Sequence, residues 1–239
     1  MASYSGDASE LLKSLDTPAY SIAETSRLVG VPRWSIKRYL RGYEYTYFIR
    51  EKVHEGQQPP VVNQTEESST YASFLDLVDL LFVKEFLKRG FSLQYLRRAL
   101  AEAKEYLGTP HFARSEFYTS GSEIILRLPK DGNMIALMTH GQIAIPEIIK
   151  KLSNKLDFEN VTEFGLARRW YPKGKKGLIV IDPQISFGRP TLIGYNVATS
   201  NIYDLYLGEK EKIGPVSDWF KIPVPKIKTA VQFEHSLWA

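Results

Sequence analysis

The sequence contains no cysteine among its 239 residues and only four histidines. The lack of cysteine excludes disulfides, thiolate nucleophiles and cysteine-ligated zinc, and it fits a reducing compartment, so we expect a cytoplasmic protein. No apolar run approaches the roughly 18 residues that suggest a membrane span. The first twenty residues lack a basic start followed by an apolar block, so we expect neither a signal peptide nor a membrane partner.

Recognisable catalytic motifs are also missing. The sequence has no glycine-rich phosphate loop and no Gly-x-Ser-x-Gly motif. The histidines, at positions 54, 111, 140 and 235, do not have the spacing of metal ligands. Asp76 and Asp79 are three residues apart, and we expect such a pair on the surface of a helix. We therefore expect a protein that is not an enzyme and that has no cofactor or metal site.

Positive charge is concentrated near the start of the chain. The formal net charge is only +4. Residues 20–54 nevertheless contain seven basic side chains, at positions 27, 33, 37, 38, 41, 50 and 52, against three glutamates, at 24, 44 and 51. Such a cluster favours a local anionic partner.

Residues 20–43 have the pattern of two short helices joined by a tight turn. Ser21 can cap the first helix together with Glu24, Gly30 can end it, and Pro32 suits the start of the second. Trp34, Ile36 and Leu40 then face a core, which leaves basic side chains outside. This pattern predicts a DNA-reading helix-turn-helix. The alternative is a helical hairpin whose basic face is only solvated.

The following segment has the composition of a β-hairpin. Residues 43–53 favour a strand, residues 56–60 a turn, and residues 61–62 a return strand, so a DNA-binding wing is expected here, or else a surface hairpin without a ligand. We expect four side chains near the major groove and two on phosphates. The first four are Arg33, Trp34, Lys37 and Arg38, and the other two are Arg41 and Arg50.

Two further helices are predicted, at residues 69–89 and 92–107, separated by Gly-Phe-Ser-Leu. With the helix-turn-helix and the wing, this order resembles the DNA-binding half of MerR-type regulators over residues 20–108. The long dimerisation helix and the effector domain of that family have no counterpart, so the resemblance implies DNA binding without metal or small-molecule sensing.

The middle of the chain has a different character. Residues 111–145 favour a β-meander or hairpin around Lys-Asp-Gly-Asn, and Pro146 favours a helix start. Residues 167–176 have five basic side chains and are expected to form a loop. From Gly177 onward the pattern predicts short strands and then helices at about 199–207, 210–220 and 225–237.

The last segment resembles the C-terminal domain of a family of VapB-type antitoxins. The similarity rests on a strand followed by Asp182–Pro183, then on Gly188–Arg189–Pro190-x-Leu-x-Gly, then on helices that end in Phe233–Glu234. Asn196 departs from the family, which more often has arginine there. The resemblance implies an antitoxin that neutralises a VapC-like PIN-domain ribonuclease toxin, and that binds operator DNA as a homodimeric autorepressor. Candidate toxin contacts are Arg168, Arg169, Trp170, Phe233, Leu237 and Trp238, and deletion of residues 233–239 is expected to release toxin activity.

The sequence therefore predicts a mostly helical α+β protein. We expect a flexible N-terminus at 1–19, or else a short docking helix there with Leu11, Leu12 and Leu15. We then expect a MerR-like winged helix-turn-helix at 20–108, a β-containing connector at 109–176, and an antitoxin-like domain with a β arm and three helices at 177–239. Two other functions fit the same sequence. One is a stand-alone MerR-like transcriptional regulator, and the other is an adaptor whose helical units both bind proteins.

Overall fold

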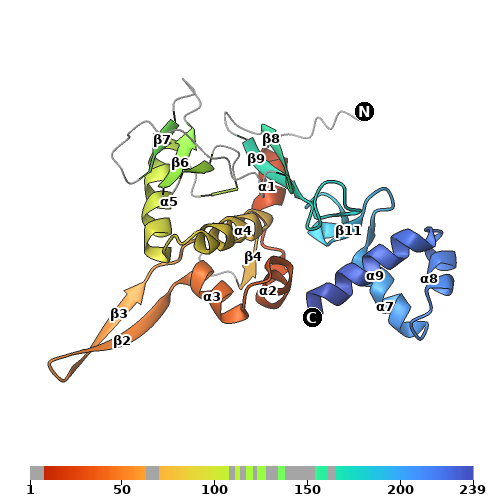
Figure 1. Cartoon of the computed structure of the whole chain (residues 1–239), viewed down its shortest axis with the longest axis horizontal. Helices are drawn as coiled ribbons and strands as arrows, with labels where there is room; N and C mark the ends of the chain where they lie inside the picture. Colours follow the sequence, from red (N-terminus) through yellow and green to blue (C-terminus); the bar gives the residue numbers. More distant parts are fainter. Residues whose placement is uncertain are drawn as a thin grey trace. The chain divides into compact units, whose positions relative to one another are not determined.

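The computed structural model describes residues 8–62, 70–107, 111–113, 117–120, 123–127, 134–137, 154–160 and 165–238. These residues form helices and small antiparallel sheets (Figure 1), so the expected helix-rich α+β class is confirmed. The chain divides into two compact units, Met1–Lys150 with Asn160–Leu166, and Lys151–Glu159 with Ala167–Ala239. None of the described helices is both long and apolar enough to cross a membrane.

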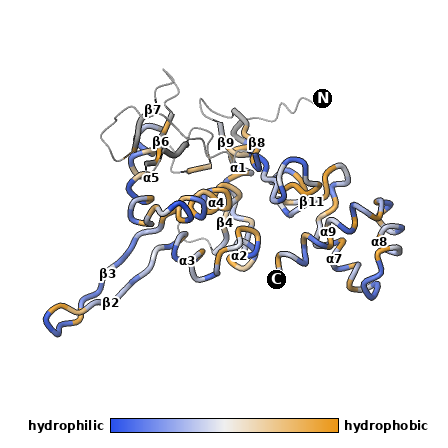
Figure 2. The backbone as a smooth tube through the Cα atoms, in the orientation of Figure 1, coloured by the Kyte–Doolittle hydropathy of each residue, from blue (hydrophilic) through white to orange (hydrophobic). Residues whose placement is uncertain are grey.

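Helix α4 (Phe74–Lys88) is the centre of the first unit. Helices α1 (Ala8–Asp16), α2 (Ile22–Val29) and α3 (Arg33–Arg41) all pack against it. Most of its side chains are buried, and much of the helix is orange in Figure 2. Leu15 of α1 is fully buried, so the part of the N-terminus from residue 8 onward docks on the core instead of being flexible. Strands β1 (Tyr20–Ser21) and β4 (Tyr71–Ala72) pair antiparallel beside these helices.

Helices α2 and α3 have the predicted boundaries. The Ser21 hydroxyl accepts a hydrogen bond from the Glu24 N–H at 3.2 Å. Gly30 ends α2 with a φ of 67°, in the left-handed region where glycine has no steric penalty. Lys84 Nζ donates to the Val29 carbonyl at 2.6 Å, which satisfies a free carbonyl at that helix end. The helix, turn and helix at residues 22–41 are therefore confirmed.

Strands β2 (Tyr43–Ile49) and β3 (Lys52–Gln58) form a long antiparallel hairpin that projects from these helices (Figure 1). The predicted position of its turn was wrong. The chain reverses at Arg50 and Glu51, whose φ angles are 47° and 66°. Two-residue hairpin turns need such angles, and Asn-Gly usually supplies them, so Arg50–Glu51 carries no residue pattern that predicts a turn. Residues 61–62 are no strand, because both N–H groups donate to the Tyr39 carbonyl.

Helix α5 (Leu93–Leu107) begins as expected, since the Tyr95 N–H donates to the Ser92 hydroxyl at 3.1 Å. Three strands then form the predicted antiparallel meander, in the order β5 (Phe117–Ser120), β6 (Glu123–Arg127) and β7 (Met134–Ala136). The Tyr95 hydroxyl joins α5 to this meander, since it donates to the Leu137 carbonyl and accepts from the Ile124 N–H. The helix expected at Pro146 lies outside the described residues.

The strands of the second unit extend further than expected. Strand β8 (Leu156–Asn160) pairs with β9 (Gly165–Trp170), and β9 contacts the next strand through a bridge between Trp170 and Ile181. The expectation of a basic loop at 167–176 was thus wrong for its first four residues, because residues 167–170 are in β9. A second sheet has the order β10 (Ile179–Val180), β11 (Thr191–Leu192) and β12 (Val197–Ala198).

Three helices complete the second unit, and their positions agree with the predicted ones. They are α7 (Thr199–Gly208), α8 (Ile213–Phe220) and α9 (Val224–Trp238). The Thr199 hydroxyl donates to the buried Glu234 carboxylate at 2.5 Å, which joins the start of α7 to α9. The strands and helices share one core made of Leu192, Ile202, Val216, Ile222, Ile227, Ala230 and Val231.

Candidate functional site

The outer face of α3 carries the basic side chains that the sequence placed there. Ile36 and Leu40 are buried, whereas Arg33, Lys37 and Arg41 are exposed. Trp34 was expected both in the core and near DNA, and the core expectation was wrong, since 62% of its surface is exposed. A large aromatic side chain and three cations thus share one accessible helix face.

Arg38 connects α3 to the hairpin. Its guanidinium carbon lies 3.8 Å from the centre of the Tyr43 ring and 5.6 Å from that of Trp34. A cation over an aromatic face is attracted to the ring's quadrupole, and the contact restrains both partners. Arg38 is half-buried, so it holds the base of the hairpin against the helix while its charge adds to the basic face.

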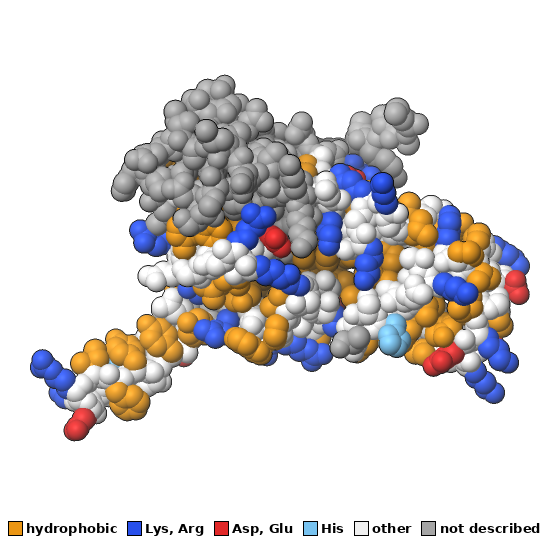
Figure 3. Space-filling view, in the orientation of Figure 1, with side chains coloured by type: hydrophobic (Ala, Val, Ile, Leu, Met, Phe, Trp, Pro, Cys, Tyr) orange, Lys and Arg blue, Asp and Glu red, His pale blue; other side chains and the backbone are white. Residues whose placement is uncertain are grey.

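One side of the hairpin is a row of aromatic rings. Tyr43, Tyr45 and Tyr47 follow one another with ring centres 6.0 and 5.7 Å apart, and His54 stacks on Tyr47 at 5.4 Å. The tip exposes Phe48, the cation Arg50 lies in the turn, and the cation Lys52 follows the turn at the start of β3. Figure 3 shows hydrophobic side chains along the hairpin and basic ones at its end. The hairpin can therefore offer both charge and apolar surface to a partner.

Arg50 stands apart from the other predicted DNA contacts. It follows a seven-residue strand, so it lies on the order of 20 Å from the hairpin base at a rise of about 3.3 Å per residue. The structure thus brings Arg33, Trp34, Lys37, Arg38 and Arg41 together on α3 and places Arg50 at a separate point. This separation would suit binding of α3 in one groove of DNA and of the hairpin tip on a neighbouring stretch of the DNA backbone.

The sequence reading missed Arg97 of α5 at the base of the hairpin. Its Nε donates to the Pro59 carbonyl at 2.7 Å and its Nη1 to Gln58 Oε1 at 3.2 Å. Partial burial lowers the pKa of Arg97, the nearby Tyr43 opposes this shift, and the positive charge of Arg38 adds to it. Arg97 and Pro59 are 38 residues apart in the sequence, and only folding brings them together. No local sequence pattern could therefore have indicated that Arg97 lies at this site.

The arginines predicted as toxin contacts have partners inside the second unit. Arg169 Nε donates to Asp182 Oδ2 at 2.6 Å, and Arg168 donates to Gln184 Oε1 at 2.8 Å. The hydrogen bond with Asp182 raises the pKa of Arg169 even though partial burial lowers it. Both arginines therefore hold the segment that begins at Asp182.

Two of the aromatic candidates for toxin contact are in the interior. Trp170 and Phe233 are both buried, so neither presents surface to a partner in this structure. Leu237 is half-buried and Trp238 is exposed at the end of α9. Because the 233–239 segment includes the buried Phe233 and Glu234, its deletion would damage the unit itself, whereas a deletion confined to residues 235–239 would spare both of them.

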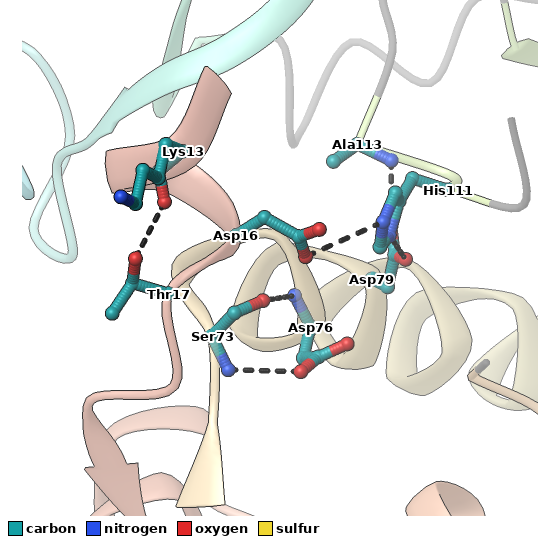
Figure 4. A network of polar contacts seen from close by, with 8 residues as sticks. All are labelled: Lys13, Asp16, Thr17, Ser73, Asp76, Asp79, His111 and Ala113. Atoms are coloured by element: carbon teal, nitrogen blue, oxygen red, sulfur yellow. Dashed lines mark hydrogen bonds and ion pairs between the residues drawn. The ribbon is translucent and has the colours of Figure 1, made fainter. Parts of the chain in front are cut away.

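The expected surface location of Asp76 and Asp79 was wrong, because both are buried in α4 (Figure 4). The Asp76 carboxylate accepts from the Ser73 N–H at 2.8 Å and completes a capping box. Asp79 pairs with His111 Nδ1 at 2.7 Å and accepts from the Ala113 N–H at 2.6 Å. Acidic residues three positions apart usually lie on the solvent-facing side of a helix. That expectation fails for α4, since other helices cover it on several sides.

Burial raises the pKa of Asp79 to about 6, although His111 opposes the shift. Burial lowers the pKa of His111, but Asp79 together with Asp76 and Asp16 raises it, so this pKa also lies above its ordinary value. The pair ties residues 111–113 to α4, and we assign it a structural role. Within the part of the chain that the structure describes, no three histidine or acidic side chains form a group that could hold a metal ion.

The comparisons with known proteins point in one direction. No protein-family model matches the sequence. Over 205 residues, 81% of this chain and 84% of the relative, the sequence is 23% identical to "Putative antitoxin VapB45" from Mycobacterium tuberculosis. This chain is a distant homologue of that protein. The crystal structure of Rv2018 from M. tuberculosis has the same fold, with a TM-score of 0.58 and 17% identity over 91% of this chain and 99% of the other.

Proposed function

We propose that this protein is an antitoxin that binds and neutralises a VapC-like PIN-domain ribonuclease toxin and represses its own operator. The observation that carries this proposal is the similarity to "Putative antitoxin VapB45" over 81% of the chain. That span is long enough to include both units, so the homology does not depend on a helix-turn-helix segment alone. We propose no catalytic activity for the protein itself.

The DNA-binding part of the proposal depends on α3 and the β2–β3 hairpin. The exposed cations of α3 would enter the major groove, and Arg50 would contact phosphates on a neighbouring stretch. A single domain of this size has few base contacts, so we propose a homodimer on a two-fold symmetric operator. In this proposal Arg38 both contacts DNA and sets the angle of the hairpin.

The toxin-binding part depends on the second unit, where the resemblance to antitoxins was noted. A PIN-domain ribonuclease uses clustered carboxylates to hold Mg²⁺. A basic side chain among those carboxylates would form charge-assisted hydrogen bonds and compete with the metal. Of the contacts expected from sequence, Arg168, Arg169 and Leu237 are half-buried and Trp238 is exposed. These four remain our candidates, and Leu237 and Trp238 lie at the end of α9.

A second function deserves the same experiment. The basic face of α3 and the hairpin belong to one unit, so the chain could act as a stand-alone MerR-like regulator without a toxin. This alternative predicts operator binding and no protein partner. The adaptor alternative predicts the opposite, with protein partners and no DNA binding even at low salt.

The test is co-expression of the full chain with the small protein encoded beside it, followed by affinity capture, an RNA-cleavage assay and a mobility shift with the upstream DNA. A stable complex with silenced cleavage supports the antitoxin. Operator binding without a captured partner would instead establish the regulator. Capture with active cleavage would contradict neutralisation.

A further inference from the structure

The loop between β10 and β11 carries an unusual phenylalanine. Phe187 has a φ of 58° and 90% of its surface is exposed. A single exposed apolar side chain is ordinary in a folded protein. A bulky residue with positive φ is not, because its side chain crowds the backbone in the left-handed region. Glycine or asparagine would satisfy the same backbone at lower cost, so folding gives no reason for phenylalanine here.

The loop is held in this conformation from both sides. The Ser186 hydroxyl donates to the Asn196 carbonyl at 3.1 Å. Arg189 donates from Nε to the Ser186 carbonyl at 3.3 Å and from Nη1 to Asn201 Oδ1 at 3.4 Å. Asn196 itself has a φ of 53°, which asparagine adopts readily, so this departure from the family pattern fits its backbone.

The base of the loop is equally restrained. Buried Asp182 accepts from Arg169, and its other carboxylate oxygen accepts from the Gln184 N–H at 2.9 Å. Buried Gly188, with a φ of 75°, donates its N–H to the Ile185 carbonyl at 3.0 Å. Residues 182–189 therefore form a rigid loop that presents an aromatic ring outward. Such pre-organisation reduces the entropy lost when a partner binds.

Arg189 places a positive charge on the same loop, two residues after Phe187. It donates to neutral oxygens of Ser186 and Asn201, and no carboxylate among the described residues forms an ion pair with it. The guanidinium is exposed and remains available for bidentate contact with a carboxylate. An aromatic ring and an arginine on a rigid loop are the residue types that dominate the binding energy of protein interfaces.

We propose that residues 185–189 are a further segment that docks the toxin, in addition to the end of α9, with Phe187 inserted in an apolar pocket and Arg189 against the carboxylates of the ribonuclease cleft. This inference rests on the proposed antitoxin function and identifies its contact surface. A toxin fits better than operator DNA, because a phenyl ring gains little from phosphates and would have to unstack bases to be buried in DNA. The acidic cleft also complements the charge of Arg189.

The test compares two variants of the full chain in complex with the small protein encoded beside it. Phe187→Asn removes the ring and suits positive φ, so the variant should fold at least as stably as the wild type while its affinity for the toxin falls roughly 30-fold or more. Arg189→Gln should release ribonuclease activity. Trp219→Ala is the control, since Trp219 is 76% exposed in the same unit but lies on a regular helix.

The outcomes separate the inference from the function on which it rests. Failure of the wild type to capture or inhibit the neighbouring protein would overturn the antitoxin proposal and this inference with it. Full binding by Phe187→Asn, beside a wild type that inhibits, would overturn the inference alone. A change only in operator affinity would also overturn the inference and would assign the loop to DNA binding. A change only in the molecular mass measured by light scattering would overturn it as well and would assign the loop to contact with a second copy of the chain.

Discussion

The guanidinium of Arg38 lies over the ring of Tyr43, 3.8 Å from its centre, so the last turn of α3 is tied to the first residue of the hairpin. Between them stands Gly42, with a φ of 71°. A Cβ at Gly42 would meet the Gln58 carbonyl oxygen at 2.1 Å, so only glycine permits this close exit from the helix. The direction of the hairpin therefore depends on these three residues.

Arg38→Lys tests the coupling between α3 and the hairpin. The variant keeps the positive charge but loses the planar group that stacks on Tyr43. We expect operator affinity to fall while the salt dependence of binding stays the same, because the number of cations is unchanged. Fluorescence anisotropy at several salt concentrations measures both quantities. Wild-type affinity in Arg38→Lys would show that stacking does not position the hairpin.

Lys37→Ala tests a simple electrostatic contact on the same helix. Lys37 is exposed on the basic face of α3. If it contacts a phosphate, its loss should reduce the slope of log affinity against log salt by about one and weaken binding to all sequences alike. Lys104→Ala, which removes an exposed lysine from α5, is the matched control. Unchanged affinity in a Lys37→Ala, Arg38→Ala double variant would move the DNA-reading surface elsewhere.

Sequence reasoning succeeded where local chemistry decides structure. The cap at Ser21 and the left-handed Gly30 marked α2 correctly, and the meander and the last three helices were placed within a few residues. These features depend on residues close together in the chain, whose backbone preferences act in any context. The helix-rich fold class followed from them.

Sequence reasoning failed where the environment of a residue depends on partners that are distant in the sequence. Asp79 looks like a surface residue until His111, 32 positions away, folds against it. Arg169 looks like part of a free basic loop until it pairs with Asp182. The turn at Arg50 and Glu51 has no glycine or asparagine to mark it, since a long ladder of strand pairs fixes its position. The strained Phe187 has no local signal either.

The Thr199–Glu234 contact predicts a stability effect in the second unit. Glu234 is buried and accepts a hydrogen bond from the Thr199 hydroxyl. Glu234→Ala leaves that hydroxyl without this acceptor and creates a cavity, so the unit should lose about 1–3 kcal/mol of unfolding free energy. Urea unfolding followed by fluorescence of the tryptophans in this unit would measure the loss. Glu209→Ala, at the exposed end of α7, should change stability by less than about 0.5 kcal/mol.

The His111–Asp79 pair predicts that the first unit loses stability as the pH rises from acid to neutral. Both groups have raised pKa values in the folded protein, so the folded state binds protons more tightly than the unfolded state. Stability must then fall as pH rises. The contribution of Asp79 is lost between its ordinary 3.8 and about 6, and that of His111 is lost above its ordinary 6.5. Nearby Asp16 and Asp76 both favour the charged histidine.

His111→Ala separates this pair from other sources of pH dependence. The change leaves Asp79 buried without its cation, which should destabilise the first unit by roughly 3–5 kcal/mol at neutral pH. The loss should be smaller at pH 5, because Asp79 can then take up a proton and avoid a buried charge. Amide hydrogen exchange within α4 at both pH values measures this difference for the unit alone. His235→Gln, an exposed histidine in the other unit, should leave α4 exchange unchanged. Equal destabilisation at the two pH values would mean that His111 supports α4 by packing and not by charge.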